Sequence, residues 1–488
     1  MVVTSRYERV YEQLCSIAGS RYVSNRQEEL FLYRWDYFTC STPPGRCDFV
    51  VLPGSTEEVQ EIIYLANRER IPVVPMVSGL NNAGLANPLQ GGIVLDLRRM
   101  NRVLEVNEDD MYAVVEGGIT WADLALYLNK KHPTLRPPIT WSPPATGVVP
   151  SLLENGMHDL GMVGGCGSDF INGLEVVLPT GEIVVTGSLA LSDSWYSRPP
   201  LPDISGLFIG WSGRTGIVTK ASMKLWPKLP RRDYSLSAKT FKDGIEIEMA
   251  LFKAGGPLLG ICDITAINSF WSLASRTYSG LDLSRVPLEP RGADYMGMLT
   301  VMASTEKEME AKAEVICDIT KKLGGRITVY EEVQRVMAEN ERGITPLVLN
   351  CPVQEFPIWN FYMGGIGEWI GGYMPIRRVP EYYLESLEIT KKYGKHALYY
   401  HRAMFGGHYN IARTLVLSNK DDPEDMRRTR ECLMELDSAL RKYGVRYKPQ
   451  YWAVLRNNNK GHAGTLGLIS RIKKMLDPNN ILNPGQGM

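Results

Sequence analysis

The chain has 488 residues, too many for one ordinary hydrophobic core, so its length predicts two or three domains. Its 54 basic and 54 acidic residues cancel, which argues against a nucleic-acid surface or an acidic tail. Hydrophobic residues at 44% and charged residues at 22% are typical of a soluble globular protein. No signal peptide and no run of about 18 apolar residues occurs, so we expect a cytoplasmic location. The eight cysteines form no CxxC pair, which argues against a zinc ribbon, an iron–sulfur site or a disulfide scaffold.

The first regular elements form a strand–helix–strand unit. A strand is predicted at Phe49–Leu52 and a helix follows it as far as Arg68. Ser55 can cap this helix, with Glu58 at the capping-box position. A second strand follows at Val73–Pro75, and this spacing predicts a parallel pair covered on one face.

A loop of small residues follows the second strand. The apolar run Ile71–Met76 leads into Ser78-Gly79-Leu80-Asn81-Asn82-Ala83-Gly84. This loop lacks the lysine of a P-loop, and its glycines do not have the GxGxxG spacing. Its consecutive amides can wrap a pyrophosphate as an anion nest, although a glycine-rich turn between strands explains the pattern equally well. Further strands are predicted at Ile93–Leu97 and Tyr112–Glu116.

A resemblance to a known family gives this loop a context. The stretch Val94–Leu128, VLDLRRMNRVLEVNEDDMYAVVEGGITWADLALYL, resembles the FAD-binding domain of the vanillyl-alcohol oxidase / p-cresol methylhydroxylase (PCMH-type) flavoproteins. Matching segments recur in the family's order near residues 143–187, 203–227, 360–420 and 471–485. The resemblance implies an α+β protein in which a PCMH-type, two-subdomain FAD-binding domain is joined to a cap or substrate domain with a helix-covered antiparallel sheet.

Domain limits follow from the strand pattern and from the closing motif. Trp226-Pro227 and the prolines beyond it end the apolar strand pattern, so we assign residues 1–230 to the FAD-binding domain. Residues 231–455 alternate helical and strand-like segments and form the predicted cap domain. Residues 456–488 contain IKKMLDPNNILNPG, which resembles the family's closing motif and implies a return to the FAD-binding domain. The helices expected in the cap domain are Lys242–Lys253, Lys307–Leu323, Pro380–Lys392 and Pro423–Tyr443, and the strands include Ala397–Tyr400 and Ala412–Leu417.

The resemblance also implies which residues contact FAD. They lie in the small-residue loop, in Ala145–Val149, in Gly167–Val177, in the segment ending at Lys220 and in the closing motif. The glycines from Gly161 to Gly167 fit a backbone that passes close to a planar ligand, and loop punctuation explains them as well. The residues carried over are Pro75, Val77, Ser78, Gly79, Leu80, Asn81, Asn82, Thr146, Gly147, Val149, Gly167, Asp169, Gly216, Ile217, Val218 and Asn483.

Single positions in the sequence indicate whether FAD is bound covalently. In one branch of the family a cap-domain histidine is bonded to the flavin, and the matching position here falls near Ile370. No histidine occurs between His158 and His396. We therefore expect non-covalent FAD, while a tyrosyl link stays open with Tyr373 as the nearest residue.

The candidate catalytic residues are His408, His401, Tyr447 and Lys448. His401 and His408 are seven residues apart, the spacing of two metal-binding histidines in D-2-hydroxyacid dehydrogenases, but the acidic residues of that motif are missing and we assign no metal. The alternatives are active-site histidines without a metal and ordinary buried histidines. Lys448 can hold a phenolate or carboxylate as a point charge, or Tyr447 and Lys448 can form a solvated strand edge.

These observations predict an FAD-dependent oxidoreductase that takes a hydride from its donor to flavin N5. An aromatic alcohol or 4-alkylphenol donor is favoured by the aromatic residues Trp369, Tyr373, Tyr451 and Trp452. A D-2-hydroxyacid of the lactate or glycolate type is favoured by the segment Gly167–Val177 and by the histidine spacing. A third reading is a flavin subunit of a larger electron-transfer complex. We expect a small-molecule substrate, an electron-accepting partner protein and a homo-oligomer or a complex, with no nucleic acid and no transmembrane segment.

Overall fold

The computed structural model describes residues 6–34, 44–80, 84–140, 142, 145–270, 293–329, 366–419, 422–446 and 463–486. The chain forms two compact units. The first contains residues 1–157, 167–228 and 449–488, and the second contains residues 158–166 and 229–448. The sequence predicts boundaries after residues 230 and 455, with residues 158–166 inside the FAD-binding domain. In the structure this short segment packs with the second unit.

The first unit begins with a four-stranded sheet in the order β1-β2-β4-β3. Strands β2 and β3 run in the same direction, as the strand–helix–strand pattern predicts, but both pair with β4, which lies between them. Every residue of β4 is buried, which suits a central strand. The elements are α1 (Arg6–Ala18), β1 (Val23–Ser24), α2 (Gln27–Leu32), β2 (Phe49–Val51), α3 (Thr56–Glu69), β3 (Val73–Met76) and β4 (Ile93–Asp96).

Helix α3 begins where the sequence predicts. Ser55 is its N-cap and accepts a hydrogen bond from the amide of Glu58 at 3.2 Å. The Glu58 carboxylate accepts a hydrogen bond from the amide of Gly54 at 2.7 Å, one residue before the cap. These bonds satisfy amide groups that the first turn of a helix leaves unpaired.

A second, antiparallel sheet completes the first unit, with five strands in the order β5-β6-β10-β8-β9. Its strands are β5 (Val103–Asn107), β6 (Tyr112–Glu116), β8 (Ile171–Val177), β9 (Ile183–Val185) and β10 (Ile217–Lys224). A small two-stranded sheet joins β7 (Leu135–Arg136) to β11 (Trp226–Pro227). The helices of this part are α4 (Trp121–Lys131), α5 (Val148–Leu153) and, near the C-terminus, α13 (Ala463–Leu476).

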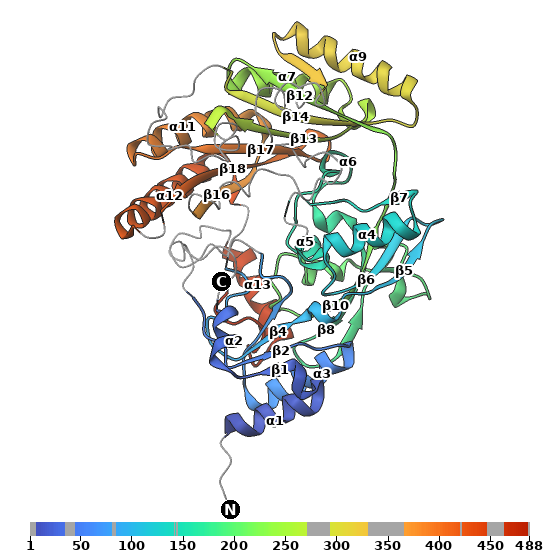
Figure 1. Ribbon diagram of the computed structural model, residues 1–488, viewed down its shortest axis with the longest axis vertical. Coiled ribbons are helices and arrows are strands. Elements are labelled where there is room, and N and C mark those ends of the chain that lie inside the picture. The colour runs from blue at the N-terminus through green and yellow to red at the C-terminus, as the bar shows by residue number, and fades with distance from the viewer. Residues whose placement is uncertain are drawn as a thin grey trace, which may run out of the picture. The chain divides into compact units, whose positions relative to one another are not determined.

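The described residues of the second unit form an eight-stranded antiparallel sheet in the order β15-β12-β14-β13-β17-β18-β16-β19. The strands are β12 (Arg231–Ala238), β13 (Ile261–Asn268), β14 (Tyr295–Met302), β15 (Arg326–Val329), β16 (Ile366–Met374), β17 (Leu398–Met404), β18 (Tyr409–Ser418) and β19 (Val445–Arg446). The long helices, seen in Figure 1, are α7 (Phe241–Lys253), α9 (Glu306–Lys322), α11 (Val379–Lys392) and α12 (Pro423–Tyr443). They begin and end within one residue of the predicted limits. The two units together have an α+β architecture, as predicted.

The two faces of this sheet differ. Side chains alternate between the faces of a strand, so every second residue shares a face. Tyr399 and Ala403 of β17 and Ala412 of β18 pack in one apolar core with residues of all four long helices. Tyr400 and Arg413 belong to the other face, opposite these helices, because they alternate with the core residues and pair with each other across β17 and β18.

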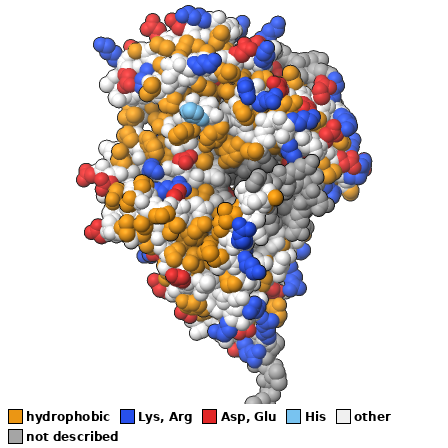
Figure 2. Space-filling model, turned by 180° about the vertical axis from the view of Figure 1, so that it is seen from behind, with side chains coloured by type: hydrophobic (Ala, Val, Ile, Leu, Met, Phe, Trp, Pro, Cys, Tyr) orange, Lys and Arg blue, Asp and Glu red, His pale blue; other side chains and the backbone are white. Residues whose placement is uncertain are grey.

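None of the helices that the structure describes combines the length and apolarity needed to cross a bilayer. Figure 2 shows Lys and Arg side chains interspersed with Asp and Glu on the face that it presents. This mixture agrees with the zero net charge of the chain.

Candidate functional site

Several segments predicted to contact FAD meet at the C-terminal end of β3. The chain turns there at Gly79, whose φ of 65° favours glycine. Gly147 lies against this turn, because a Cβ on it would stand 3.0 Å from Cγ1 of Val77. Gly213 approaches from another loop, since a Cβ there would stand 2.4 Å from Cγ of Pro75. Three segments that are distant in the sequence therefore converge in the first unit.

The closing motif ties these segments together. Asn483 is 1% exposed and donates from Nδ2 to the carbonyl oxygens of Leu85 and Ser212, each at 2.8 Å. Gln486, also buried, donates to the carbonyl oxygen of Gly84. The Asn483 amide thus links the loop after β3 to the loop before β10, and the Gln486 amide holds the first of these loops.

A buried lysine, Lys473, holds the closing motif in place through polar contacts. Lys473 Nζ forms an ion pair with Asp477 and donates to the carbonyl oxygens of Arg214 at 2.7 Å and Leu482 at 3.0 Å. Burial lowers the pKa of the Lys473 ammonium group, and the Asp477 carboxylate opposes this effect. Asp477 in turn accepts hydrogen bonds from the amides of Ile481 and Leu482 at 2.9 and 2.8 Å. The geometry of the motif is therefore fixed by buried polar contacts.

Hydrogen-bond donors are available where these segments meet. The amides of Ser78, Gly79 and Leu80 donate to no other backbone group in the described part of the chain. The hydroxyl oxygens of Thr146 and Ser212 are buried there without a hydrogen-bond partner among the described residues. A diphosphate offers only acceptor oxygens, so a cradle of free amides and hydroxyls fits the pyrophosphate of FAD.

The remaining residues predicted to contact FAD lie in other elements of the first unit. Ile217 and Val218 are buried in β10, and Gly216 directly precedes them. Gly167 and Asp169 lie in η3 (Gly167–Phe170), which packs against α5, and Asp169 is exposed. Val149 is a buried residue of α5. The predicted contacts Asn81 and Asn82 lie outside the described residues.

In the second unit the face opposite the long helices carries aromatic rings and a guanidinium group. We call it the aromatic face and define it by Trp369, Tyr373, Tyr400, Tyr409 and Arg413. The guanidinium carbon of Arg413 stands 4.1 Å from the centroid of the Trp369 ring, within the range of a cation–π contact. Tyr373 and Tyr409 meet edge to face at 5.6 Å between ring centroids. Aromatic rings and a guanidinium group are the kinds of side chain that interact with an aromatic ring and with an anionic oxygen.

His401 lies on the opposite side of the sheet, among the long helices. Its Nε2 stands 2.9 Å from both carboxylate oxygens of Glu248 on α7, and both side chains are fully buried. Tyr295 donates its hydroxyl to the same carboxylate, and Phe241 packs edge to face on the imidazole at 5.6 Å. His401 is thus enclosed in the core that the helices form with the sheet. Of the alternatives that the sequence left open, this placement favours a buried structural histidine.

His408 ends the turn between β17 and β18 and is exposed. Its ring lies 5.9 Å from that of Phe405 in the same turn. The described residues contain no group of three or more His, Cys, Asp or Glu that could hold a metal ion. Of the other candidates, Ile370 packs in the helix-covered core and Tyr373 belongs to the aromatic face. Tyr447 and Lys448 lie outside the described residues.

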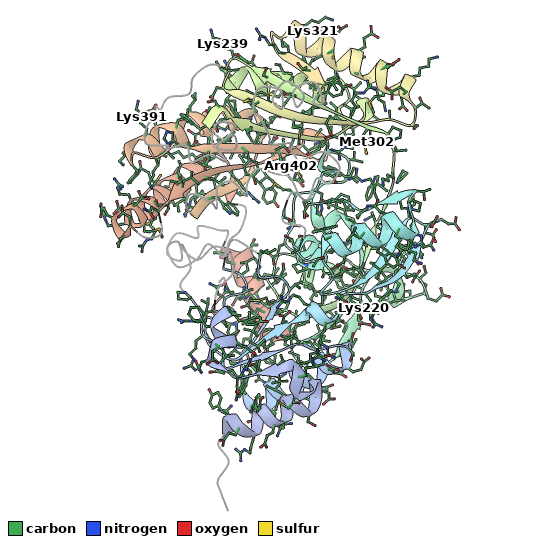
Figure 3. All side chains as sticks on the ribbon, viewed as in Figure 1. Lys220, Lys239, Met302, Lys321, Lys391 and Arg402 are labelled. Atoms are coloured by element: carbon green, nitrogen blue, oxygen red, sulfur yellow. The ribbon has the colours of Figure 1, made fainter. Side chains whose placement is uncertain are left out.

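A buried arginine next to the aromatic face holds the segment 158–166. Arg402, labelled in Figure 3, is paired with Asp263 at 2.7 Å, and the two side chains are 1% and 2% exposed. Arg402 also donates to the carbonyl oxygen of His158 at 2.7 Å. A Cβ on Gly161 of α6 (Gly161–Gly164) would stand 3.0 Å from Sδ of Met404, so close packing against β17 accounts for this glycine. The sequence alone left two explanations for the glycines here, a planar ligand and loop punctuation.

Sequence reasoning missed three residues of these sites. Ser212 and Gln486 complete the contacts around the turn after β3. The only sequence signal for them is that each lies next to a segment that resembles the family. Arg413 was missed although its signal is clear in the sequence. It is the one charged residue in the strand-like run Ala412–Leu417, where a strand buried on both faces has apolar residues.

Comparisons with known proteins agree with this geometry. One family model, described as FAD binding domain, matches residues 47–187, and another, described as FAD linked oxidases, C-terminal domain, matches residues 457–486. The 4-cresol dehydrogenase [hydroxylating] flavoprotein subunit of Pseudomonas putida is 24% identical over 520 residues, covering 99% of this chain and 96% of that protein. A glycolate oxidase subunit of Bacillus subtilis is 33% identical over 222 residues, which cover 45% of each protein. A crystal structure of p-cresol methylhydroxylase with substrate bound shares the fold, with a TM-score of 0.85 at 22% identity over 99% of this chain and 97% of that one.

Proposed function

We propose that this FAD-linked oxidoreductase, whose fold is of the PCMH type, oxidises an aromatic alcohol or a 4-alkylphenol. We further place it in the vanillyl-alcohol oxidase / p-cresol methylhydroxylase branch. When bound, FAD supplies the hydride acceptor. The residues of the chain bind the cofactor, hold the donor, limit access of water and accept or steer the donor's proton.

The aromatic face carries this proposal. Trp369 and Tyr400 are 3% and 4% exposed, and Tyr373 and Tyr409 form an aromatic pair on the same face. Aromatic side chains bind an aryl ring through its face or its edge, and a pocket that excludes water strengthens hydrogen bonds to the donor. A small aliphatic hydroxyacid has no ring to use these surfaces. The likeness to the 4-cresol dehydrogenase subunit over 99% of the chain supports the same donor class.

We assign separate roles to the two histidines. His408 steers the donor's proton, because its exposed ring is free of the core and lies in a segment that resembles the active-site cap of the family. His401 stabilises the second unit through its buried contact with Glu248. Tyr447 and Lys448 stay candidates for binding the donor.

The remaining proposals concern attachment, partners and location. We propose non-covalent FAD, which acid should release from the protein. We also propose a homo-oligomer or an electron-accepting partner, since one relative is named as the flavoprotein subunit of its enzyme. A cytoplasmic location remains our proposal from the composition.

The second candidate function is D-2-hydroxyacid dehydrogenation. It is favoured by the segment Gly167–Val177 and by the glycolate oxidase subunit among the relatives. If this function used a metal at His401 and His408, a chelator should slow flavin reduction. We expect no effect of a chelator, since His401 is enclosed with Glu248 in the helix-covered core.

An anaerobic screen tests the proposed function. The oxidised holoprotein is mixed with 4-hydroxybenzyl alcohol, a 4-alkylphenol, D-lactate and glycolate, and bleaching of the flavin absorbance is followed. We expect bleaching by the aromatic donors and little by the hydroxyacids. Bleaching by hydroxyacids alone would establish the second candidate. No bleaching by any of them would contradict both.

A further inference from the structure

Strand β9 forms one edge of the five-stranded sheet in the first unit and pairs with β8 alone. Two hydrogen bonds with the chain segment that contains β8 flank it. The carbonyl oxygen of Glu182 accepts one at 2.8 Å, and the amide of Thr186 donates the other at 2.9 Å. Residues that exchange hydrogen bonds across an antiparallel pair alternate with residues that do not. The backbone groups of Val184 therefore point to β8, and those of Ile183 and Val185 point away from it.

This edge differs from the other edges of the three larger sheets. An exposed edge offers unpaired amides and carbonyls to another chain, and proteins commonly protect it with a charge, a proline, a bulge or a very short strand. Strand β9 carries no charge and no proline, and the uncharged run continues to Ser192. The other edge strands that the structure describes are β5 with Glu105 and a bulge, β1 with two residues, β3 with Pro75, β15 with Arg326 and β19 with Arg446. Among the described sheets, β9 is thus the edge left open for pairing.

Apolar side chains line this edge on the face that α3 covers. Ile183 lies opposite Val177, which packs in the core formed with α3, so these two side chains share a face. Ile183 is 37% exposed, and Tyr64 of α3 is 44% exposed. The Tyr64 ring lies against the hairpin that leads into β9, since a Cβ on Gly181 would collide with it. An exposed aliphatic side chain and an exposed aromatic one therefore accompany the open backbone groups.

We propose that two copies of this chain associate through β9, which pairs antiparallel with the same strand of the second copy. This inference rests on the homo-oligomer proposed above and is independent of the donor. A two-fold axis at Val184 sets Ile183 opposite Val185 of the partner subunit, and both residues have outward backbone groups. No charged side chains meet between these residues, and the zero net charge of the chain causes no general repulsion between copies. The edge is therefore complementary to itself.

The geometry leaves room for the helices of both copies. The two-fold axis is perpendicular to the joined sheet, so α3 lies on the same face in each copy. Helix α3 packs on β8, where the Thr56 hydroxyl donates to the Glu175 carboxylate at 2.7 Å. In the joined sheet the two β8 strands are three strand spacings apart, roughly 14 Å, whereas packed helices need about 8–10 Å. Two α3 helices therefore fit side by side, with space for the Tyr64 side chains between them.

Variants of the full-length holoprotein test the pairing. Ile183→Pro removes an outward amide and keeps the hydrogen bonds to β8, which run through Val184. Ile183→Lys places a charge on the edge instead. Val184→Cys puts a cysteine on the two-fold axis, where opposed Cα atoms lie about 4.5 Å apart, within the range of a disulfide. Leu104→Cys is the control, since Leu104 is 40% exposed on the bulged edge strand β5.

Sedimentation velocity over a range of concentrations measures self-association, and mild oxidation followed by non-reducing electrophoresis measures cross-linking. We expect a wild-type dimer whose Kd rises roughly tenfold or more in both Ile183 variants, since Ile183→Pro loses a hydrogen bond in each copy and Ile183→Lys brings a charge to the interface. Val184→Cys should form a covalent dimer, whereas the wild type and Leu104→Cys should not. The rate of flavin reduction per bound flavin should stay at the wild-type value in every variant.

The outcomes separate this inference from the other proposals. A wild type that is monomeric at every concentration overturns the inference and the homo-oligomer together. A wild-type dimer that persists in both Ile183 variants, or that fails to cross-link through Val184→Cys, overturns the inference and leaves the homo-oligomer to another surface. If a lower Tm shows that Ile183→Pro is misfolded, Ile183→Lys and the Val184→Cys cross-link decide. The proposed donor fails separately, if no donor bleaches the wild-type flavin.

Discussion

At the scale of single residues, the two histidines of β17 and its turn are expected to respond in opposite ways to substitution. His401→Ala removes a hydrogen bond from the buried Glu248 carboxylate, which keeps the hydroxyl of Tyr295, and leaving a buried polar group partly unsatisfied costs about 1–3 kcal/mol. We expect such a loss in the free energy of unfolding, measured with denaturant. The rate of flavin reduction per bound flavin should stay within a few-fold of the wild-type rate.

His408→Ala is the matched variant. An exposed side chain in a turn contributes little to stability, so the unfolding free energy should change by less than about 0.5 kcal/mol. Loss of a positioned acid or base slows a reaction by about two to four orders of magnitude, and flavin reduction should fall by that amount. A slow His401→Ala enzyme of normal stability, together with a fast His408→Ala enzyme, would reverse our assignment.

Residue spacing alone could not separate these histidines. All seven residues of β17 are buried, so no alternation of polar and apolar residues shows which side chains face the helices. The face is decided by pairing with β13 and β18, whose partners are distant in the sequence. For the same reason the neighbour of His401 in the chain, Arg402, was not predicted to pair with Asp263.

At the scale of elements, the closing motif after α13 is expected to control FAD retention. Asn483→Ala removes two side-chain hydrogen bonds and leaves the carbonyls of Leu85 and Ser212 buried without these donors. An unsatisfied buried polar group costs about 1–3 kcal/mol, so the Kd for FAD should rise by roughly 5- to 100-fold. Titration of apoprotein with FAD, followed by quenching of flavin fluorescence, measures this change.

Asn479→Ala is the control, because Asn479 also makes a side-chain hydrogen bond, to Asn67 at 2.9 Å, but does not touch the loops that meet after β3. Its Kd for FAD should stay close to that of the wild type. An equal rise in both variants would show that the motif acts through general stability. An unchanged Kd in Asn483→Ala would contradict its proposed role.

Elements were predicted best where local rules determine them. Ser55 caps α3 as expected and accepts a hydrogen bond from the amide of Glu58, three residues later. The insertion of β4 between β2 and β3 was not predicted, because sequence order does not fix strand order. The docking of residues 158–166 on the second unit was missed for a similar reason, since it depends on Arg402, more than two hundred residues away.

At the scale of the whole molecule, the closing motif returns the chain to the first unit after the second unit is complete. The bridge between Val73 and Leu482 extends the sheet that carries the loop predicted to contact FAD. Segments from both ends of the chain thus meet in the first unit. The resemblance of several separate segments predicted this return, which composition alone did not.

The central claim is that the flavin takes a hydride from the benzylic carbon of an aromatic donor. Anaerobic single-turnover reduction of the holoprotein with 4-hydroxybenzyl alcohol, unlabelled and dideuterated at the carbinol carbon, tests it most directly. We predict complete flavin bleaching that is several-fold slower with deuterium, because breaking the C–H bond limits the observed step. Flavin that stays oxidised with this donor, while D-lactate bleaches it, would contradict the claim.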